Sequence, residues 1–320
     1  MEPSAFKKLI EQVAILSRPQ RADLADVLSR GLRQEQAAAL IDAVVPRACP
    51  HCRSSRLHRN GQADGRQRYR CVECVRSFNA LTGTPLARLR HRSKWLCYLE
   101  CMLQSGTVRR AAALVGIHQN TSFRWRHRFL AGAKHDRSVR LAGITEADET
   151  YLRESQKGSR QLTRAPRRRG GSARQRGLSH EHDCILVARD RSGRTVDFVT
   201  GRAPLQSLHL QRCLIPVVAP DILLVTDGHA AYPVFARQAG IRHSAVTLSA
   251  GVRVDAVLHV QNVNAYHSRF KQWLRHFHGV ASRYLPNYLG WRWALDANRI
   301  SSPAMLLRSA LGSIPDLAVT

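Results

Sequence analysis

Four cysteines near the N-terminus have the spacing of a metal site. They form two C-x2-C pairs separated by eighteen residues: Cys49, Cys52, Cys71 and Cys74. A hairpin between the pairs would bring the four thiolates into the tetrahedral shell that Zn²⁺ prefers. The segment is too small for a hydrophobic core, so the metal would stabilise its fold. The spacing predicts a structural zinc ribbon; four unrelated buried cysteines are the alternative.

Acidic side chains gather at two further places. Asp227 follows an apolar run, 221–226, that predicts a buried strand. Asp148 lies in an acidic stretch, in which the two-residue period of a strand puts Glu146 and Asp148 on one face and Glu149 on the other. Carboxylates gathered at one spot can hold two divalent ions roughly 4 Å apart, as phosphoryl transfer requires. Each acid alone is more simply a surface carboxylate, so the hypothesis needs a third ligand.

A late helix, predicted at 260–277, has no glutamate that could be this third ligand. From Gly228 to Leu295, a stretch that includes this helix, the only acid is Asp255. The helix instead carries Asn264, His267 and Lys271 at positions i, i+3 and i+7, which share one face. An Asn carbonyl oxygen can bind a hard cation, and a Lys can hold a phosphate. From physics alone a solvated basic face is favoured.

The charge of the chain favours nucleic acid as its partner. Its 320 residues include 50 Lys and Arg against 23 Asp and Glu, a net charge of +27. Such a field attracts polyanions, and no apolar run is long enough to span a bilayer. The segment 157–176 has seven Arg and no acid. We expect Arg167, Arg168 and Arg169 to lie along a phosphate backbone, although a solvated insertion would look the same.

Two helical regions precede the acidic residues. Residues 5–45 predict two amphipathic helices that break near Ser17, the second interrupted at Gly31, with a role in packing or self-association. Farther on, an Ala-rich helix, the turn at Gly116 and a basic helix at 118–129 predict a helix-turn-helix. Trp125 would pack inward. The residues that would read DNA are Asn120, Thr121, Arg124 and Arg128. A helical hairpin with a basic solvent face is the alternative.

The rest of the chain alternates strand and helix patterns. The strands are expected at 144–152, 184–188, 195–200, 221–226 and 244–248, and the helices at 205–218, 230–239 and 260–277. This alternation predicts a mixed sheet flanked by helices.

Several stretches together resemble the zinc-ribbon insertion-sequence transposases of the DDE superfamily. They are Cys49-Pro-His-Cys52, Tyr69-Arg-Cys71-Val-Glu-Cys74, Asp148-Glu-Thr150, Val225-Thr-Asp227-Gly228 and His259 through Lys271. Many members have Glu where this chain has Asn264, and one branch uses Asn with a downstream Lys. The resemblance implies an RNase H-like catalytic domain in which Asp148, Asp227 and Asn264 bind Mg²⁺ or Mn²⁺, with Lys271 as the accompanying base.

The expected layout is multidomain. It comprises an N-terminal helical segment (1–45), the zinc ribbon (46–84), the helix-turn-helix segment (85–135), the RNase H-like α/β catalytic domain (140–300) and a C-terminal tail (301–320). The chain would cleave the ends of an insertion sequence and join the 3′-hydroxyls to target DNA. Its partners would be double-stranded DNA, at terminal inverted repeats and target, and a second copy in a homodimer or larger assembly. A bacterial cytoplasmic, nucleoid-associated location is expected.

Two other functions remain open from the sequence. A catalytically inactive DNA-binding protein or regulator derived from a transposase would bind DNA specifically without cleaving it. A general RNase H-like nuclease would cleave without preferring terminal repeats, and the ribbon and the helix-turn-helix count against it.

Overall fold

The computed structural model describes residues 2–133, 140–168, 171, 173–246 and 258–312. The chain divides into two compact units, the first made of Met1–Phe129 with Ile300–Thr320 and the second of Leu130–Arg299. Within the described ranges, no helix combines the length and the apolar character that crossing a membrane requires.

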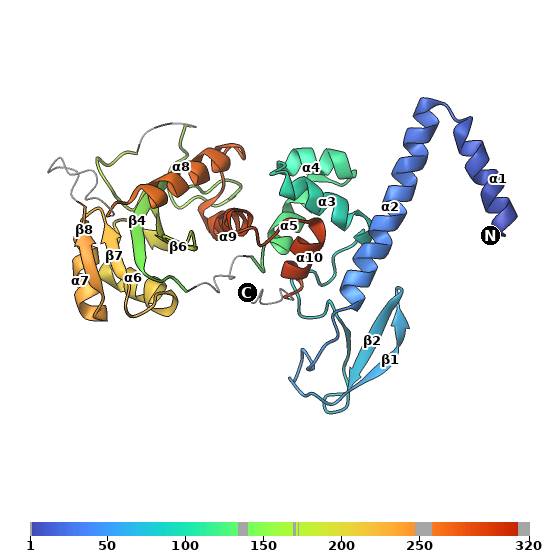
Figure 1. Ribbon diagram of the computed structural model, residues 1–320, viewed down its shortest axis with the longest axis horizontal. Coiled ribbons are helices and arrows are strands. Elements are labelled where there is room, and N and C mark those ends of the chain that lie inside the picture. The colour runs from blue at the N-terminus through green and yellow to red at the C-terminus, as the bar shows by residue number, and fades with distance from the viewer. Residues whose placement is uncertain (1, 134–139, 169–170, 172, 247–257, 313–320) are drawn as a thin grey trace. The chain divides into compact units, whose positions relative to one another are not determined.

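Two helices begin the first unit, α1 (Pro3–Ala14) and α2 (Arg18–Asp42) (Figure 1). The predicted break lies between them. The Ser17 hydroxyl accepts a hydrogen bond from the Gln20 amide, and the Gln20 side chain accepts one from the Ser17 amide. This reciprocal cap starts α2. The expected interruption at Gly31 is wrong because α2 runs through it, and a single glycine costs a helix only about 1 kcal/mol.

A three-stranded antiparallel sheet follows, in the order β1-β2-β3. Its strands are β1 (Leu57–Ala63), β2 (Arg66–Cys71) and β3 (Ser77–Asn79). Asp64 and Gly65 have positive φ angles of 51° and 69°, so they form the tight two-residue turn that suits right-twisted strands. The sheet thereby brings Cys71, at the end of β2, back toward the first cysteine pair.

The other helices of the first unit enclose an aromatic core. They are α3 (Trp95–Leu103), α4 (Val108–Val115), α5 (Gln119–Phe129) and α10 (Pro303–Ala310). Trp95, Trp125 and Phe129 are buried, and both tryptophans meet Phe129 edge-on. The inward position predicted for Trp125 is therefore confirmed. Gly116, with a φ of 64°, ends α4 before the turn into α5.

Helix α10 lies near the C-terminus yet packs in the first unit, against α2, α3 and α5. It buries Leu306, Leu307 and Ala310. The structure thus differs from the C-terminal tail expected at 301–320. Ser302 accepts a hydrogen bond from the Met305 amide, and this Ser-Pro start is a recognisable helix signal.

The second unit contains a five-stranded mixed sheet in the order β6-β5-β4-β7-β8. The strands are β4 (Ile144–Arg153), β5 (His182–Asp190), β6 (Thr195–Arg202), β7 (Leu223–Thr226) and β8 (Arg242–Ala245). The first three are antiparallel neighbours, and β7 and β8 run parallel to β4. The end of the predicted strand at 244–248 lies partly outside the described residues.

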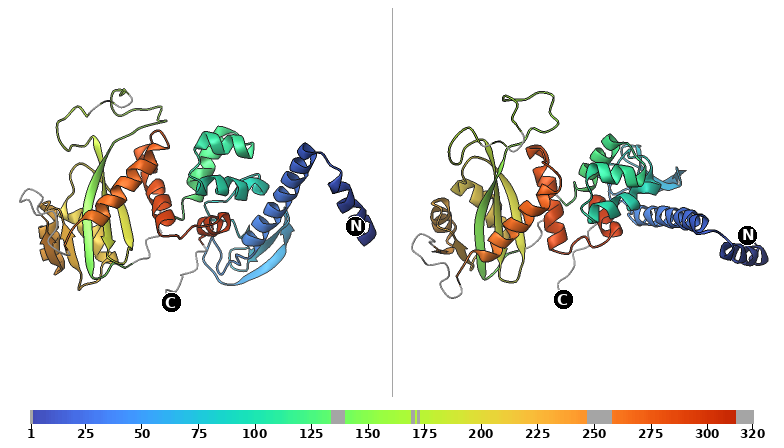
Figure 2. Two further views of the ribbon diagram at one scale, coloured as in Figure 1. Left: turned by 45° about the horizontal axis from the view of Figure 1, so that its top comes forward. Right: turned by 90° about the horizontal axis from the view of Figure 1, so that it is seen from above.

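Helices cover both faces of this sheet (Figure 2). One face packs against α6 (Ser207–Leu214) and α7 (Ala231–Ala239), and the other against α8 (Gln261–Arg275) and α9 (Leu285–Asp296). Alternate residues of β5 serve the two cores: Leu186 faces α6 and α7, whereas Val187 faces α8 and α9. A strand buried on both faces reads as continuously apolar. The predicted mixed sheet flanked by helices is confirmed.

Candidate functional site

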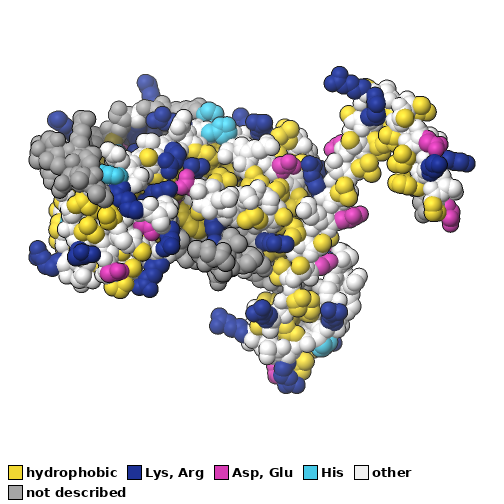
Figure 3. Space-filling model, viewed as in Figure 1, with side chains coloured by type: hydrophobic (Ala, Val, Ile, Leu, Met, Phe, Trp, Pro, Cys, Tyr) yellow, Lys and Arg dark blue, Asp and Glu magenta, His cyan; other side chains and the backbone are white. Residues whose placement is uncertain are grey.

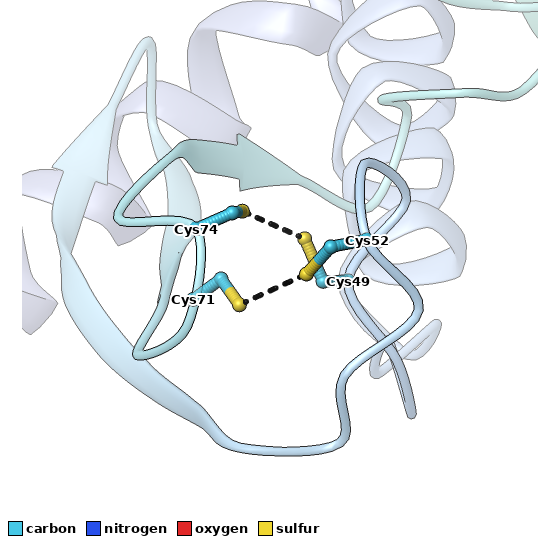
Figure 4. Close-up of side chains that lie close together, drawn as sticks. All are labelled: Cys49, Cys52, Cys71 and Cys74. Carbon is cyan, nitrogen blue, oxygen red and sulfur yellow. Dashed lines mark hydrogen bonds between the residues drawn. The ribbon is translucent and has the colours of Figure 1, made fainter.

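The four predicted zinc ligands lie together in the first unit (Figure 4). Their sulfur atoms all lie within 4.8 Å of one another, with Cys49 Sγ 3.6 Å from Cys74 Sγ and Cys52 Sγ 3.5 Å from Cys71 Sγ. Four sulfurs at Zn–S bonds of about 2.3 Å in a tetrahedron are about 3.8 Å apart. The spacing therefore fits a Cys₄ zinc site, as the sequence predicts.

Each cysteine pair is held in a tight knuckle. The Arg53 amide donates to the Cys49 carbonyl at 2.8 Å, and Arg53 and Val75, which follow the two pairs, have φ angles of 64° and 59°. The backbone amide of Cys74 is the main cause that lowers the pKa of Cys71 to about 7. A thiol with a lowered pKa is more readily ionised to the thiolate that binds zinc.

A cluster of three carboxylates lies on the sheet of the second unit. Asp148, Glu149 and Asp227 each offer an oxygen within 4.8 Å of the others. Glu146 pairs with Val225 in the parallel register of β4 and β7, so Asp148, two residues on, is level with Asp227 just past the end of β7. The predicted pair is brought together, and the sheet explains why.

Two carboxylates of this cluster, Asp148 and Glu149, have raised pKa values. Burial, the Asp227 charge and the Glu149 charge raise the pKa of Asp148 from its ordinary value of 3.8 to about 7. Burial also raises the pKa of Glu149, although the Tyr232 hydroxyl donates a hydrogen bond to that carboxylate at 2.8 Å. Neighbouring ionised carboxylates repel each other, and a cation between them relieves that repulsion. Oxygen donors of this kind suit Mg²⁺ and Mn²⁺.

Helix α8 lies against β4 beside this cluster. Its residue His267 is 6% exposed, and its Nδ1 is 3.8 Å from Asp148 Oδ2. Burial lowers the pKa of His267 to about 4, assisted by the positive charge of Lys271. The same Lys271 acts on Asp148, whose pKa it lowers against the effect of burial. Asn264, one turn earlier, is exposed, and among the described residues its side chain has no hydrogen bond to Asp148 or Asp227.

Glu146 anchors α8 and is not a member of the cluster. Its carboxylate is fully buried and accepts hydrogen bonds from the backbone amides of Asn262 and Val263 at 2.8 and 3.1 Å. Arg191 pairs with the same carboxylate. A carboxylate at a helix N-terminus satisfies amides that have no partner within the helix. Glu146 therefore fixes where α8 starts over β4, and with it the position of His267.

A cavity of about 400 Å³ lies between β4 and the C-terminal half of α8. Lys271, Arg153 and Arg275 line it together with apolar side chains such as Leu152 and Leu274. Basic groups thus continue along α8 from the carboxylate cluster.

The predicted DNA-reading residues lie on α5. Asn120, Arg124 and Arg128 are exposed, and Thr121 is partly exposed. Arg128 donates to the Pro85 carbonyl at 2.9 Å, so its guanidinium already has one partner. These positions leave Arg124 and Asn120 free to meet a ligand, whereas Trp125 on the opposite side is buried.

The arginines of the 157–176 segment differ in their surroundings. Arg167 forms ion pairs with Glu154 and Glu181 and has a side chain only 14% exposed, so it holds the loop to the sheet. Arg168 is exposed. Arg169 lies outside the described residues.

Two members of the carboxylate site are missing from the sequence-based set. The strand period predicts Glu149 on the face of β4 opposite to Asp148, and it lies there. Its carboxylate nonetheless reaches those of Asp148 and Asp227, because Asp227 lies just past the end of the adjacent strand. His267 shares a helix face with Asn264, and their spacing alone does not show which of the two faces the sheet. The sequence signal that does show it is the apolar set Val263, Tyr266 and Phe270, which marks the buried face of α8.

Comparison with known proteins agrees with these features. Residues 140–293 match the family model described as an ISXO2-like transposase domain. A protein of Halobacterium salinarum, described as an uncharacterized protein in transposable element ISH50, is 29% identical over 247 residues, which are 75% of this chain and 82% of the relative.

Two solved structures are more distantly similar. One is a pre-cleavage Mos1 transpososome, 14% identical, with 68% of this chain and 78% of that chain covered and a TM-score of 0.22. The other is a Mos1 strand transfer complex, also 14% identical, with 62% and 77% covered and a TM-score of 0.19. The use of Asn264 by a separate branch stays a prediction. The family match confirms the resemblance to insertion-sequence transposases, and residues 140–293 are an ISXO2-like transposase domain of the DDE superfamily.

Proposed function

We propose that this chain is a DNA transposase that cleaves the ends of an insertion sequence and joins the freed 3′-hydroxyls to target DNA. The observation that carries the proposal is the cluster of Asp148, Glu149 and Asp227 inside the ISXO2-like transposase domain. The strand order, with three antiparallel strands followed by two parallel to the first, supports an RNase H-like domain.

Asp148 and Asp227 would hold Mg²⁺ or Mn²⁺, with Asn264 as the third ligand by the family resemblance. When bound, two such ions activate the attacking oxygen and stabilise the leaving one. The protein contributes to the reaction by placing these ligand oxygens at one edge of the sheet. Lys271 is close enough to influence the Asp148 carboxylate, and we assign it the contact to a DNA phosphate.

The first unit would find the DNA. A Cys₄ ribbon and the pair α4 and α5 precede the transposase domain, and α5 offers Arg124 and Asn120 to the major groove. The net charge of +27 supplies general affinity for phosphate, which weakens with salt. We assign Arg168, which is exposed, to the DNA backbone, whereas the ion pairs of Arg167 argue against such a role for that residue.

Pairing two transposon ends requires at least a dimer, and we assign this role to α1 and α2. The apolar side chains Phe6, Ile10, Leu28 and Leu32 are more than half exposed, and Figure 3 shows hydrophobic atoms along both helices. Light scattering of the chain with paired repeat ends tests this, and a monomer in that complex contradicts it.

One observation favours a second function. Asn264 stands where many family members have Glu and is exposed, as a lesion in an inactive DNA-binding protein or regulator would be. Such a protein would bind terminal repeats independently of Mg²⁺ or Mn²⁺ and would not cleave them.

The experiment that tests the proposal is cleavage of a labelled duplex carrying the terminal inverted repeat of the element, with Mg²⁺ or Mn²⁺. Wild type is compared with Asp227→Ala and with Asp221→Ala, an exposed acid just before β7 that serves as the matched control. Repeat-specific cleavage lost only in Asp227→Ala supports the transposase. Specific binding without cleavage in any of the three proteins favours the inactive regulator.

A further inference from the structure

A larger cavity, of about 720 Å³, lies in the first unit beside the ribbon sheet. One wall carries Arg66 from β2 and Ser77 and Asn79 from β3, and the other is formed by the segment 87–92. Tyr69, three residues along β2 from Arg66, lies on the opposite face of the sheet, where it packs with the predicted zinc ligands. The sheet wall of the cavity is therefore the face turned away from the cysteine cluster.

Positive side chains dominate the lining of this cavity. Asp64 is the acid that lines it, and the basic lining residues are Arg66, Arg88, Arg90, Arg92, His51 and His91. The Asp64 carboxylate is 4.0 Å from Arg66 Nη2 and 3.9 Å from Arg92 Nη2, which is too far for a hydrogen bond. Its side chain is also 77% exposed, and an exposed carboxylate at such distances neutralises little of the neighbouring charge. The lining thus keeps an excess of positive charge.

Arg66 is the residue at which this excess is most costly. Its side chain is only 11% exposed, and its Nε and Nη1 atoms are buried without a hydrogen-bond partner among the described residues. Buried polar groups are normally hydrogen-bonded, and a charge held away from water is unfavourable unless it is paired. The fold therefore holds a guanidinium at the cavity without supplying the anion that would balance it.

The missing anion has the chemistry of a phosphate. Guanidinium groups bind phosphate oxygens through several N–H donors at once, and four arginines line this cavity. The Ser77 hydroxyl accepts a hydrogen bond from Asn60 Nδ2 at 3.2 Å, which leaves its own proton to donate. The volume exceeds that of a single small anion and falls within the range of about 300–1,000 Å³ that is usual for larger ligands. A phosphate with its attached sugars, as in a DNA backbone, suits this space.

We propose that this cavity binds a phosphate of the DNA backbone, with Arg66 and Arg92 as its principal contacts. The inference rests on the proposed function and adds to it a binding site separate from the base-reading residues of α5. Contacts to phosphate carry little sequence information, but they fix the register of a protein on the duplex. The site would hold the first unit in one register on the DNA while Arg124 and Asn120 meet the bases.

The test neutralises the DNA phosphates one at a time. Each phosphate of a labelled terminal-repeat duplex is replaced in turn by an uncharged methylphosphonate, and the affinity of the full-length, zinc-loaded chain is measured by fluorescence anisotropy. We expect one position, or two adjacent ones, at which the replacement weakens wild-type binding on the order of tenfold. Arg66→Gln should bind the unmodified duplex more weakly by a similar factor, and replacement at that position should weaken it no further.

The matched control is Arg59→Gln. Arg59 is exposed on β1 and does not line the cavity, so this variant loses the same charge from the same sheet. It should keep the tenfold effect of the replaced phosphate. The zinc content of each variant shows whether its ribbon is intact.

A second variant tests the opposite change and does not disturb Arg66. Asp64→Asn removes the carboxylate that competes with a phosphate, and Asn tolerates the positive φ of 51° at this turn. We expect it to tighten binding to the unmodified duplex about two- to fivefold. Asp23→Asn makes the same change of charge at an exposed position on α2 outside the cavity lining and should tighten binding less.

Three results would overturn the proposal. One is a phosphate scan that is the same in Arg66→Gln as in wild type, and another is equal tightening in Asp64→Asn and Asp23→Asn. The third concerns a free anion, for which inorganic phosphate at constant ionic strength is the probe. If inorganic phosphate raises the Tm of wild type but not of Arg66→Gln, and no DNA phosphate depends on Arg66, the cavity binds a free anion and not the DNA backbone.

The inference and the proposed function can fail separately. If one phosphate depends on Arg66 but the wild type does not cleave the terminal repeat, the transposase activity is wrong and the phosphate site stands. If the repeat is cleaved while no phosphate depends on Arg66, the activity stands and the phosphate site is wrong.

Discussion

Asp148 on β4 and Asp227, just past the end of β7, lie at the same level of the sheet, because each follows by two residues the parallel pair formed by Glu146 and Val225. Adjacent strands are only about 4.8 Å apart, so two carboxylates at that level must repel each other unless a proton or a cation intervenes. Burial, and after it the repulsion from Asp227 and Glu149, raises the pKa of Asp148.

Metal binding should stabilise the protein more at high pH. The pKa of Asp148 is about 7 in the folded, metal-free chain against an ordinary 3.8, so the folded state binds more protons in that window and its stability falls as the pH rises through it. A divalent ion replaces the proton. We expect the Mn²⁺-induced rise in Tm to be larger near pH 8 than near pH 6, measured by scanning calorimetry.

The control for this prediction is Asp148→Asn. The amide cannot ionise, so the metal-free variant should melt above the wild type near pH 8, and the pH dependence of the Mn²⁺ effect should shrink. An equal Mn²⁺ shift at both pH values in the wild type would contradict the assignment.

Removal of a carboxylate should stop catalysis and leave DNA binding intact. We expect Asp227→Ala to lower the cleavage rate on the order of 10³-fold, because the charge that holds the ion is gone. Its affinity for the terminal repeat, measured by fluorescence anisotropy, should stay within about twofold of wild type, since the residues that we propose to read the repeat lie in the first unit. A parallel fall in both quantities would point to misfolding.

Zinc should be structural and confined to the ribbon. Cys71→Ser removes one of four thiolates, and a small metal-dependent fold unravels when its shell is broken. We expect the zinc content, measured by mass spectrometry, to fall from one per chain to near zero and repeat-specific binding to be lost. Cys97→Ser, a partly buried cysteine on α3, is the control and should keep its zinc. Loss of zinc from both variants would count against the ribbon.

Helix α5 should determine repeat specificity. Arg124 is exposed on α5, and loss of a base-reading arginine costs about 1–3 kcal/mol of binding energy. We expect Arg124→Ala to weaken binding to the terminal repeat by that amount while binding to unrelated DNA changes less. Arg212→Ala, an exposed arginine on α6, should lose no specificity in the same competition assay. Equal losses of affinity for both DNAs would indicate that Arg124 contacts only phosphate.

The sequence could predict the features that depend on local patterns. Three local patterns are each typical of one structure: the C-x2-C pairs, the apolar strand before Asp227 and the apolar face of α8. The meeting of Glu149 with Asp227 depends instead on strand order and register, which join residues far apart in the chain. The place where α8 begins over β4 likewise depends on a distant residue, because Glu146, more than a hundred residues earlier, accepts hydrogen bonds from its first amides.

That anchoring role gives the last prediction. Glu146 is fully buried, pairs with Arg191, and accepts from the first amides of α8. Glu146→Ala would leave a largely buried arginine and two amides without their partner, and breaking a buried pair in this way costs about 3–5 kcal/mol. We expect a lower Tm and weaker Mn²⁺ binding, because α8 would no longer hold its residues against Asp148.

The control variant is Glu154→Ala, which removes a different buried, arginine-paired carboxylate, the one that holds the 157–176 loop. It should lower Tm yet leave Mn²⁺ affinity unchanged, and equal loss of affinity in both variants would show that general destabilisation, and not the placement of α8, controls the metal site.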